Sequence, residues 1–201
     1  MPRAQLFVGA PVALAVSRWR FARLRRAHPR PFGLAGGPAP MMLSSDGWGP
    51  GLTDVVLSYG RPLASAGQLI EVGTCFAERH CFLPSLEEEI RQAEHRDAAW
   101  ARGDWESAGD PFDPVPHVPV RPGGFEREER TVVVAGEERA MTVVARGNYQ
   151  ALRFRQDLAV VTAVARPGFP GVPTFQIVDD LEPYFAGYTR FVLSWLRFWQ
   201  T

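Results

Sequence analysis

The sequence predicts an α+β fold, in which an antiparallel β-meander of four to five strands packs against a C-terminal amphipathic helix. An additional helix is predicted near residues 85–103. Three observations support this class: a hairpin signal at Gly147-Asn148 inside a long strand-like region, a capped helical pattern that begins at Ser85, and an apolar stripe along the last twenty residues.

The N-terminal 40 residues differ in charge from the rest of the chain. They carry seven arginines and no acidic residue, whereas residues 41–201 hold 15 arginines against 22 acidic residues, a net charge of −7. The apolar run at residues 4–16 is too short to span a bilayer and lacks the charge order of a secretory signal. We therefore expect residues 1–40 to be a basic head outside the domain, whose deletion leaves the melting temperature nearly unchanged. It is a disordered tail, an anchor to an anionic surface, or a leader upstream of a true start at Met41 or Met42.

Residues 41–201 are long enough for a single α+β domain. All 22 basic residues are arginine, and Ala, Gly and Pro are abundant, which is typical of a bacterial protein from a high-GC genome. We expect a cytoplasmic protein whose two cysteines, Cys75 and Cys81, stay reduced.

The first helix follows a region that the pattern leaves ambiguous, residues 52–83, where only DVVLSYG is compatible with a strand. Ser85 and Glu88 have capping-box spacing, and apolar residues then recur at helical intervals as far as Trp100. Five prolines in residues 110–124 indicate a stiff connector, with a proline-rich ligand for an aromatic groove as the alternative.

The β-meander is predicted from the turn at Gly147-Asn148. This turn pairs Arg146 with Tyr149 and Val144 with Ala151, and extends to Thr142 with Arg153 and Ala140 with Arg155. Because side chains alternate along a strand, the opposite face then collects most of the large apolar residues, which are Met141, Val143, Leu152 and Phe154.

The neighbouring strands extend the same apolar face. Val132 and Val134 join it through a turn near Glu137-Glu138. After Gln156-Asp157, a two-residue loop would turn Ala159, Val161 and Ala163 inward, whereas a three-residue loop with a bulge would turn Val160 and Val164 inward. The larger side-chain volume favours the bulge. A short strand at residues 174–178 is expected to form an edge.

The C-terminal helix is predicted to begin after Asp180, with Pro183 in its first turn. Its broad apolar stripe covers the sheet, and Arg190 and Arg197 argue against a simple membrane span. The outer edge of the stripe is a candidate contact with a partner or with a second copy in a homodimer, and it comprises Leu193, Phe198 and Trp199.

No motif in the sequence predicts catalysis. Cys75, His80 and Cys81 do not supply the four closely spaced ligands of a zinc site, and the runs of acidic residues are explained by helix starts. We expect no catalytic residues, no metal and no cofactor.

One surface constellation is a candidate binding site, namely Arg146, Tyr149, Arg153 and Arg155 on the open face of the hairpin. Aligned arginines beside an aromatic ring can hold a carboxylate, a phosphate or the acidic edge of a partner. The alternative is an ordinary solvated sheet face, neutralised by Glu137 and Glu138. Nucleic acid is excluded as a partner because the net charge of the domain would repel phosphates.

The functional hypothesis is a small cytosolic, non-enzymatic protein-binding module of immunity-protein or adaptor type, with another protein as its partner. The alternative is a small-ligand binder or enzyme with a pocket between the sheet and the C-terminal helix. Membrane association through the basic head is a third hypothesis, which we do not favour.

Overall fold

The computed structural model describes residues 29–46, 54–60, 68–76, 83–101 and 124–186, together with a few isolated positions before residue 28. Its main helix is α2, Leu86–Ala101. The strands are β1 (Phe32–Leu34), β2 (Pro40–Asp46), β3 (Asp54–Gly60), β4 (Leu69–Cys75), β5 (Glu126–Val134), β6 (Glu137–Arg146), β7 (Tyr149–Gln156), β8 (Ala159–Arg166) and β9 (Thr174–Ile177).

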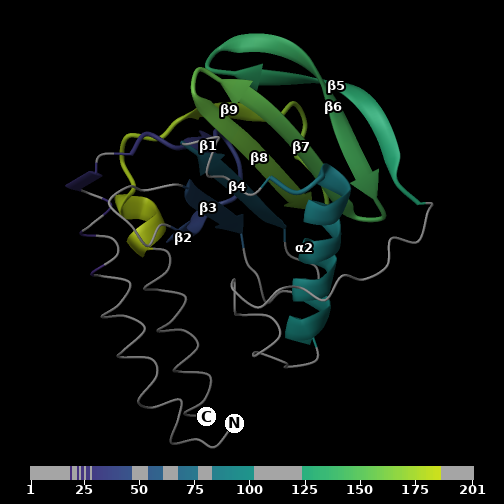
Figure 1. The fold of residues 1–201 in the computed structure, drawn as a ribbon, viewed down its shortest axis with the longest axis horizontal. Coiled ribbons are helices and arrows are strands. Elements are labelled where there is room, and N and C mark those ends of the chain that lie inside the picture. The colour runs from purple at the N-terminus through teal and green to yellow at the C-terminus, as the bar shows by residue number, and fades with distance from the viewer. Residues whose placement is uncertain are drawn as a thin grey trace, which may run out of the picture.

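The described strands form one mixed, curled sheet in the order β1-β9-β5-β6-β7-β8-β4-β3-β2 (Figure 1). Among the described strand pairs, only β5 and β9 run parallel. The expected meander, β5 to β8, is therefore the middle of a nine-stranded sheet, and the prediction of four to five strands is wrong. The strand at Thr174–Ile177 is not an edge, because it lies between β1 and β5.

The N-terminal boundary of the sheet also differs from the prediction. Phe32–Leu34 pairs with β9, and Pro40 begins β2, so residues 29–40 do not belong to a detached head. The charge pattern did not indicate that this segment belongs to the sheet. Its single arginine, Arg30, is exposed and pairs with Asp179 at 2.8 Å. For these residues the expectation of a separable head is wrong.

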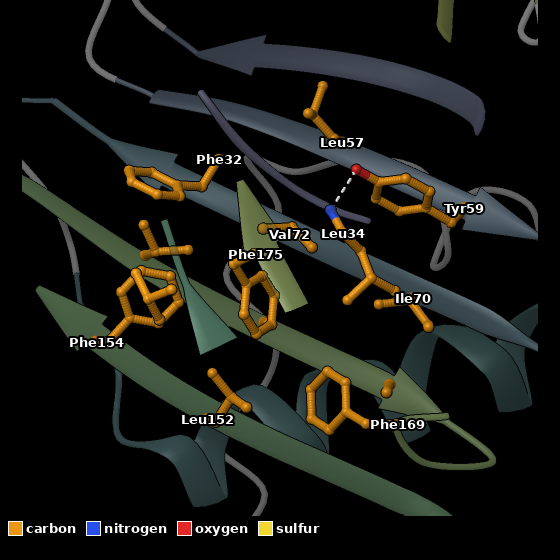
Figure 2. Close-up of a cluster of buried hydrophobic side chains, with 14 of the residues drawn as sticks. Phe32, Leu34, Leu57, Tyr59, Ile70, Val72, Leu152, Phe154, Phe169 and Phe175 are labelled. Atoms are coloured by element: carbon orange, nitrogen blue, oxygen red, sulfur yellow. Dashed lines mark hydrogen bonds between the residues drawn. The ribbon is translucent and has the colours of Figure 1, made fainter. Parts of the chain in front are cut away.

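Strand β1 is fastened to the opposite side of the curled sheet by buried hydrogen bonds. The backbone N–H of Phe32 donates to Thr74 Oγ1 at 2.9 Å. Figure 2 shows the second bond, in which the N–H of Leu34 donates to the hydroxyl of Tyr59 at 2.7 Å. A Cβ on Gly33 would lie 2.4 Å from the same hydroxyl, so only glycine permits this approach. Side chains of β3 and β4 thus close the concave face of the sheet against β1.

The concave side holds the main hydrophobic core (Figure 2). Phe154 contacts Phe32 edge-to-face, with ring centroids 5.6 Å apart, and Phe175 at 5.2 Å. Val132, Val143 and Leu152 are fully buried beside them, as the alternation of side chains predicted. The predicted assignment of these residues to the apolar face is confirmed.

The hairpin at Gly147-Asn148 has the predicted register, with Arg146 opposite Tyr149 and Val144 opposite Ala151. Gly147 has a φ of 55°, as a glycine in the first position of a tight hairpin turn allows. The turn before β6 is Ala135-Gly136, slightly earlier than expected, since Val134 pairs with Glu137.

The preferred bulge between β7 and β8 is wrong. Gln156 pairs with Ala159 across a two-residue loop, so Val161 and Ala163 face the main core beside Phe154 and Leu152. Side-chain volume did not distinguish the two loop lengths, because Val160 and Val164 are buried as well, on the convex side of the sheet. A strand that is covered on both faces does not show which face is the core.

The described part of the C-terminal helix is its first turn, residues 182–186. Asp180 Oδ1 accepts a hydrogen bond from the N–H of Glu182 at 2.9 Å, which is the predicted cap. Leu181 and Tyr184 enter the main core, where the hydroxyl of Tyr184 lies 2.7 Å from that of Tyr59. The rest of the predicted helix, including Leu193, Phe198 and Trp199, lies outside the described residues.

Candidate binding face on the convex side of the sheet

The convex face of β6, β7 and β8 is covered by α2. The helix begins as predicted, with Ser85 Oγ accepting a hydrogen bond from the N–H of Glu88 at 3.2 Å. Its apolar side is narrow, and the two buried members Ile90 and Ala93 pack on Val144, Ala151 and Val164. The sequence predicted that the arginine face of the hairpin is open. In the structure this face is instead largely an internal interface with α2.

Acidic residues of α2 neutralise the arginines beneath it. Arg146 lies 3.5 Å from Glu94, and Arg153 lies 3.3 Å from Glu89 while its Nε donates to Thr162 Oγ1 at 2.7 Å. These carboxylates come from the helix. Glu137, which was expected to help neutralise the arginine face, instead pairs with Arg139 on its own strand at 2.8 Å.

Tyr149 completes the row at the C-terminal half of α2. Its hydroxyl donates to Asp97 Oδ2 at 2.6 Å, and Arg166 forms an ion pair with the same carboxylate. Burial, and then the hydrogen bond to Asp97, raise the pKa of Tyr149 to about 12. The phenol therefore keeps its proton at neutral pH, where it acts as a hydrogen-bond donor and not as a base.

Three of the four predicted site residues, Arg146, Tyr149 and Arg153, thus lie together under α2. Arg155, further along β7, is exposed. The residues that the sequence did not bring into the site are the acidic partners on α2 and Phe125, whose ring lies beneath the guanidinium groups of Arg91 and Arg146 at 5.2 and 5.1 Å. One sequence feature could have indicated these acidic partners. On α2, Glu89 and Glu94 lie four positions from the buried residues Ala93 and Ile90, which places them near the covered side of the helix.

The carboxyl of Glu89 has a raised pKa, first because it is buried between α2 and the sheet, and in spite of the nearby Arg153 and Arg96. A raised pKa means that the folded chain binds this proton more tightly than the unfolded chain. The contribution of Glu89 to the free energy of unfolding is therefore complete below about pH 4.5, the ordinary pKa of a glutamate. This contribution falls as the pH rises through the pKa of Glu89 in the folded chain. Glu87 has the opposite sign, because a hydrogen bond from its own backbone N–H lowers its pKa.

We expect a Glu89→Gln variant to lose less unfolding free energy than the unmodified chain as the pH rises from about 4.5 to neutrality. Urea denaturation across this range measures the difference. A Glu87→Gln variant is the matched control, since it should instead reduce the loss of stability on the acid side. Equal slopes for Glu89→Gln and the unmodified chain above pH 4.5 would contradict the assigned burial of Glu89.

Strands β6 and β7 separate near the N-terminal end of α2, where Arg153 still contacts Glu89. Their pairing stops at Val144 and Ala151, although β6 stays paired with β5 as far as Glu137, and β7 with β8 as far as Gln156. The predicted pairs of Thr142 with Arg153 and Ala140 with Arg155 are not formed. We call the stretch between residues 138–143 of β6 and 152–156 of β7 the β6–β7 opening.

The topology accounts for the β6–β7 opening. At this end of the sheet β5 pairs in parallel with β9, through Val133 and Val134, and the N–H of Ala135 bonds to the carbonyl of Phe175 at 2.9 Å. Strand β7 instead follows β8, which pairs with β4. The hairpin of β5 and β6 is thus held towards β9 and β1, and that of β7 and β8 towards β4, so the two diverge.

Three further properties of the described residues bear on their function. No group of three or more His, Cys, Asp or Glu among them is placed to hold a metal ion. Cys75 is in a disulfide and is not the reduced thiol that we expected; Cys81 lies outside the described part of the chain. In that part, no helix combines the length and apolar character that crossing a bilayer requires.

Comparison with known protein families, with curated proteins and with solved structures finds no match to this chain.

Proposed function

We propose that the chain is a small, non-enzymatic protein-binding module, and that a partner binds on the convex side of the sheet at the β6–β7 opening. The observation that carries this proposal is the interrupted pairing of β6 and β7 beside Arg153 and Arg155. Unpaired strand edges are established sites for the addition of a strand from another protein.

The neighbouring surface supports a binding role over a catalytic one. The ionised side chains under α2 are engaged with each other, and Tyr149 keeps its proton at neutral pH. On the concave side, Leu181, Tyr184 and Phe185 pack on the main core, where the alternative hypothesis places a ligand pocket. No observation favours that alternative. An adaptor or immunity-type role agrees with a module that presents a sheet edge.

The exposed outer face of β6 offers a direct test. We expect a photo-reactive residue at Thr142 to form a discrete adduct with another protein in cells that produce the chain. The same residue at Val172, which is 57% exposed in the loop before β9, is the control position and should form none. Mass spectrometry of the adducts measures both.

The adduct at Thr142 should disappear when Ala140 is replaced by proline and persist when it is replaced by serine, because only proline removes a backbone N–H from the strand edge. Equal adducts at Thr142 and Val172, or none at Thr142, would overturn the proposed function.

A further inference from the structure

We infer that the two ends of the chain together bind the surface of an anionic lipid bilayer. This interaction goes beyond the proposed function and does not depend on it, because it uses neither the β6–β7 opening nor the arginines of the hairpin. Two observations carry it. The fold brings two arginine-rich segments without acidic residues to one edge of the sheet, and it exposes Trp19 and Arg26 there.

The charges of the chain are separated along the sequence. All 22 acidic residues lie between Asp46 and Glu182, together with 13 arginines, so this stretch has a net charge of 13 − 22 = −9. Residues 1–45 and 183–201 carry the other nine arginines and no acidic residue, a net charge of +9. We call these two stretches the acid-free segments. A neutral protein of this kind can bind an anionic surface with one side only, provided that its basic segments meet.

Both acid-free segments start from the same edge of the sheet. Strands β1 and β9 lie side by side and antiparallel, so the chain enters β1 where it leaves β9 (Figure 1). The N–H of Val178 donates to the carbonyl of Pro31 at 2.8 Å. Leu24 is 2% exposed in the main core, which also holds Leu181 and Tyr184. The sequence did not favour a membrane role, because it does not show that the two basic segments are neighbours.

The described helical positions before residue 28 expose a tryptophan and an arginine on one face. Trp19 and Arg26 are seven positions apart, which is about two turns of an α-helix, so they share a face. Leu24 lies on the opposite face and is buried in the main core. Trp19 is 60% exposed, and Arg26 is exposed as well. The burial of Leu24 therefore turns a basic aromatic face outward.

Three acidic residues directly follow β9 and reduce the positive charge at this edge. Asp179 pairs with Arg30 at 2.8 Å, and Asp180 caps the next turn by accepting the N–H of Glu182 at 2.9 Å. All three are exposed. The acid-free segments that start beside them contain nine arginines, so arginine outnumbers these carboxylates threefold.

Aromatic and apolar residues in the acid-free segments favour a bilayer over a nucleic acid. Besides the exposed Trp19, residues 184–199 contain seven aromatic residues, and residues 4–16 contain no charged residue. Tryptophan and tyrosine concentrate at the membrane–water interface, and basic segments with apolar residues bind anionic lipid. Surfaces that bind nucleic acid are instead polar as well as basic. A bilayer that contains anionic lipid matches both the charge and the apolar residues.

Sedimentation of the full chain with lipid vesicles tests the inference. One set of vesicles is phosphatidylcholine alone, and the other is an equal mixture of phosphatidylcholine and phosphatidylglycerol. We expect at least about tenfold tighter binding to the anionic vesicles, and a smaller difference as salt is added. Equal binding to both sets would overturn the inference. So would tighter binding to a short DNA duplex than to the anionic vesicles.

Arginine variants locate the surface. Arg26→Ala should weaken binding to the anionic vesicles about fivefold, and Arg190→Ala in the C-terminal acid-free segment should have a similar effect. Arg127→Ala is the matched control, since it removes the same charge from a side chain on β5 that is 66% exposed and pairs with Glu87. This control should change binding by less than about twofold. An equal loss in all three variants would show that only net charge matters and would refute the assigned surface.

Tryptophan fluorescence tests the contact with lipid directly. Brominated lipids in the anionic vesicles should quench part of the fluorescence, and Trp19→Phe should reduce the quenched part. The matched control is Trp100→Phe near the end of α2, which should leave the quenched part unchanged. Quenching that is unaffected by Trp19→Phe, or reduced equally by both variants, would contradict the orientation of the chain on the bilayer and overturn the inference.

Discussion

Deletion of residues 1–40 is expected to abolish the cooperative unfolding transition of this chain. The deletion removes β1 and the first residue of β2, and with them Phe32 and Leu34, which are 4% and 7% exposed in the main core. The loss of one such side chain typically costs about 2–5 kcal/mol, and whole domains are stable by about 5–15 kcal/mol. Leu24, which is 2% exposed in the same core, is lost as well, so three core residues and a strand approach the full stability of the domain.

An unsatisfied polar group adds to this cost. Without β1, Thr74 Oγ1 loses the N–H of Phe32, whereas the hydroxyl of Tyr59 loses the N–H of Leu34 but keeps its contact with the hydroxyl of Tyr184. Thr74 is fully buried in the intact protein, where a polar group without a partner costs about 1–3 kcal/mol. Circular dichroism during urea titration measures the transition.

Point variants separate the strand from the rest of the deleted segment. Phe32→Ala should lower the unfolding free energy by about 3–5 kcal/mol. Arg30→Ala should change it by less than about 0.5 kcal/mol, because the ion pair with Asp179 is exposed. A deleted chain that unfolds cooperatively at the original temperature would show that β1 does not belong to the core, as the charge pattern of the sequence suggested.

The sequence predicted best where one strand face was covered and the other carried charge. Around Gly147 the glycine turn and the alternation of Leu152, Arg153 and Phe154 agreed on one register, and this register is present. The start of α2 and the cap at Asp180 were predictable for a similar reason, since each depends on a local side chain to backbone hydrogen bond.

Prediction failed where long-range contacts decide the structure. Thr74 and Ser58 are buried polar residues that interrupt the apolar pattern of β4 and β3, and Thr74 is retained because it bonds to β1, which is 42 residues away. The same limit applied to the site. The arginines of the hairpin could be placed on one face, but not the helix that neutralises them, because Glu89 and Arg153 are distant in sequence. The β6–β7 opening depends on the pairing of β5 with β9, for which the sequence has no local signal.

Phe154→Ala is expected to destabilise the chain by about 3–5 kcal/mol, because it removes a ring that is 6% exposed and leaves a cavity beside Phe32 and Phe175. The adjacent residue is the matched comparison. Arg153→Ala should cost about 1–2 kcal/mol, more than an exposed residue would, since it removes the hydrogen bonds to Thr162 and Glu89 under α2. Urea denaturation at one pH measures both variants.

Arg155→Ala completes the comparison on the same strand and should change stability by less than about 0.5 kcal/mol, because its side chain is exposed. The expected order of effects, Phe154 above Arg153 above Arg155, follows from three levels of burial along one strand. A shift of the register by one residue would exchange the inward and outward positions and make Arg153→Ala the more damaging change. That reversed order would contradict both the main core and the β6–β7 opening. The predicted order, together with unchanged folding of Arg155→Ala, makes any loss of partner binding in that variant a direct effect on the binding surface.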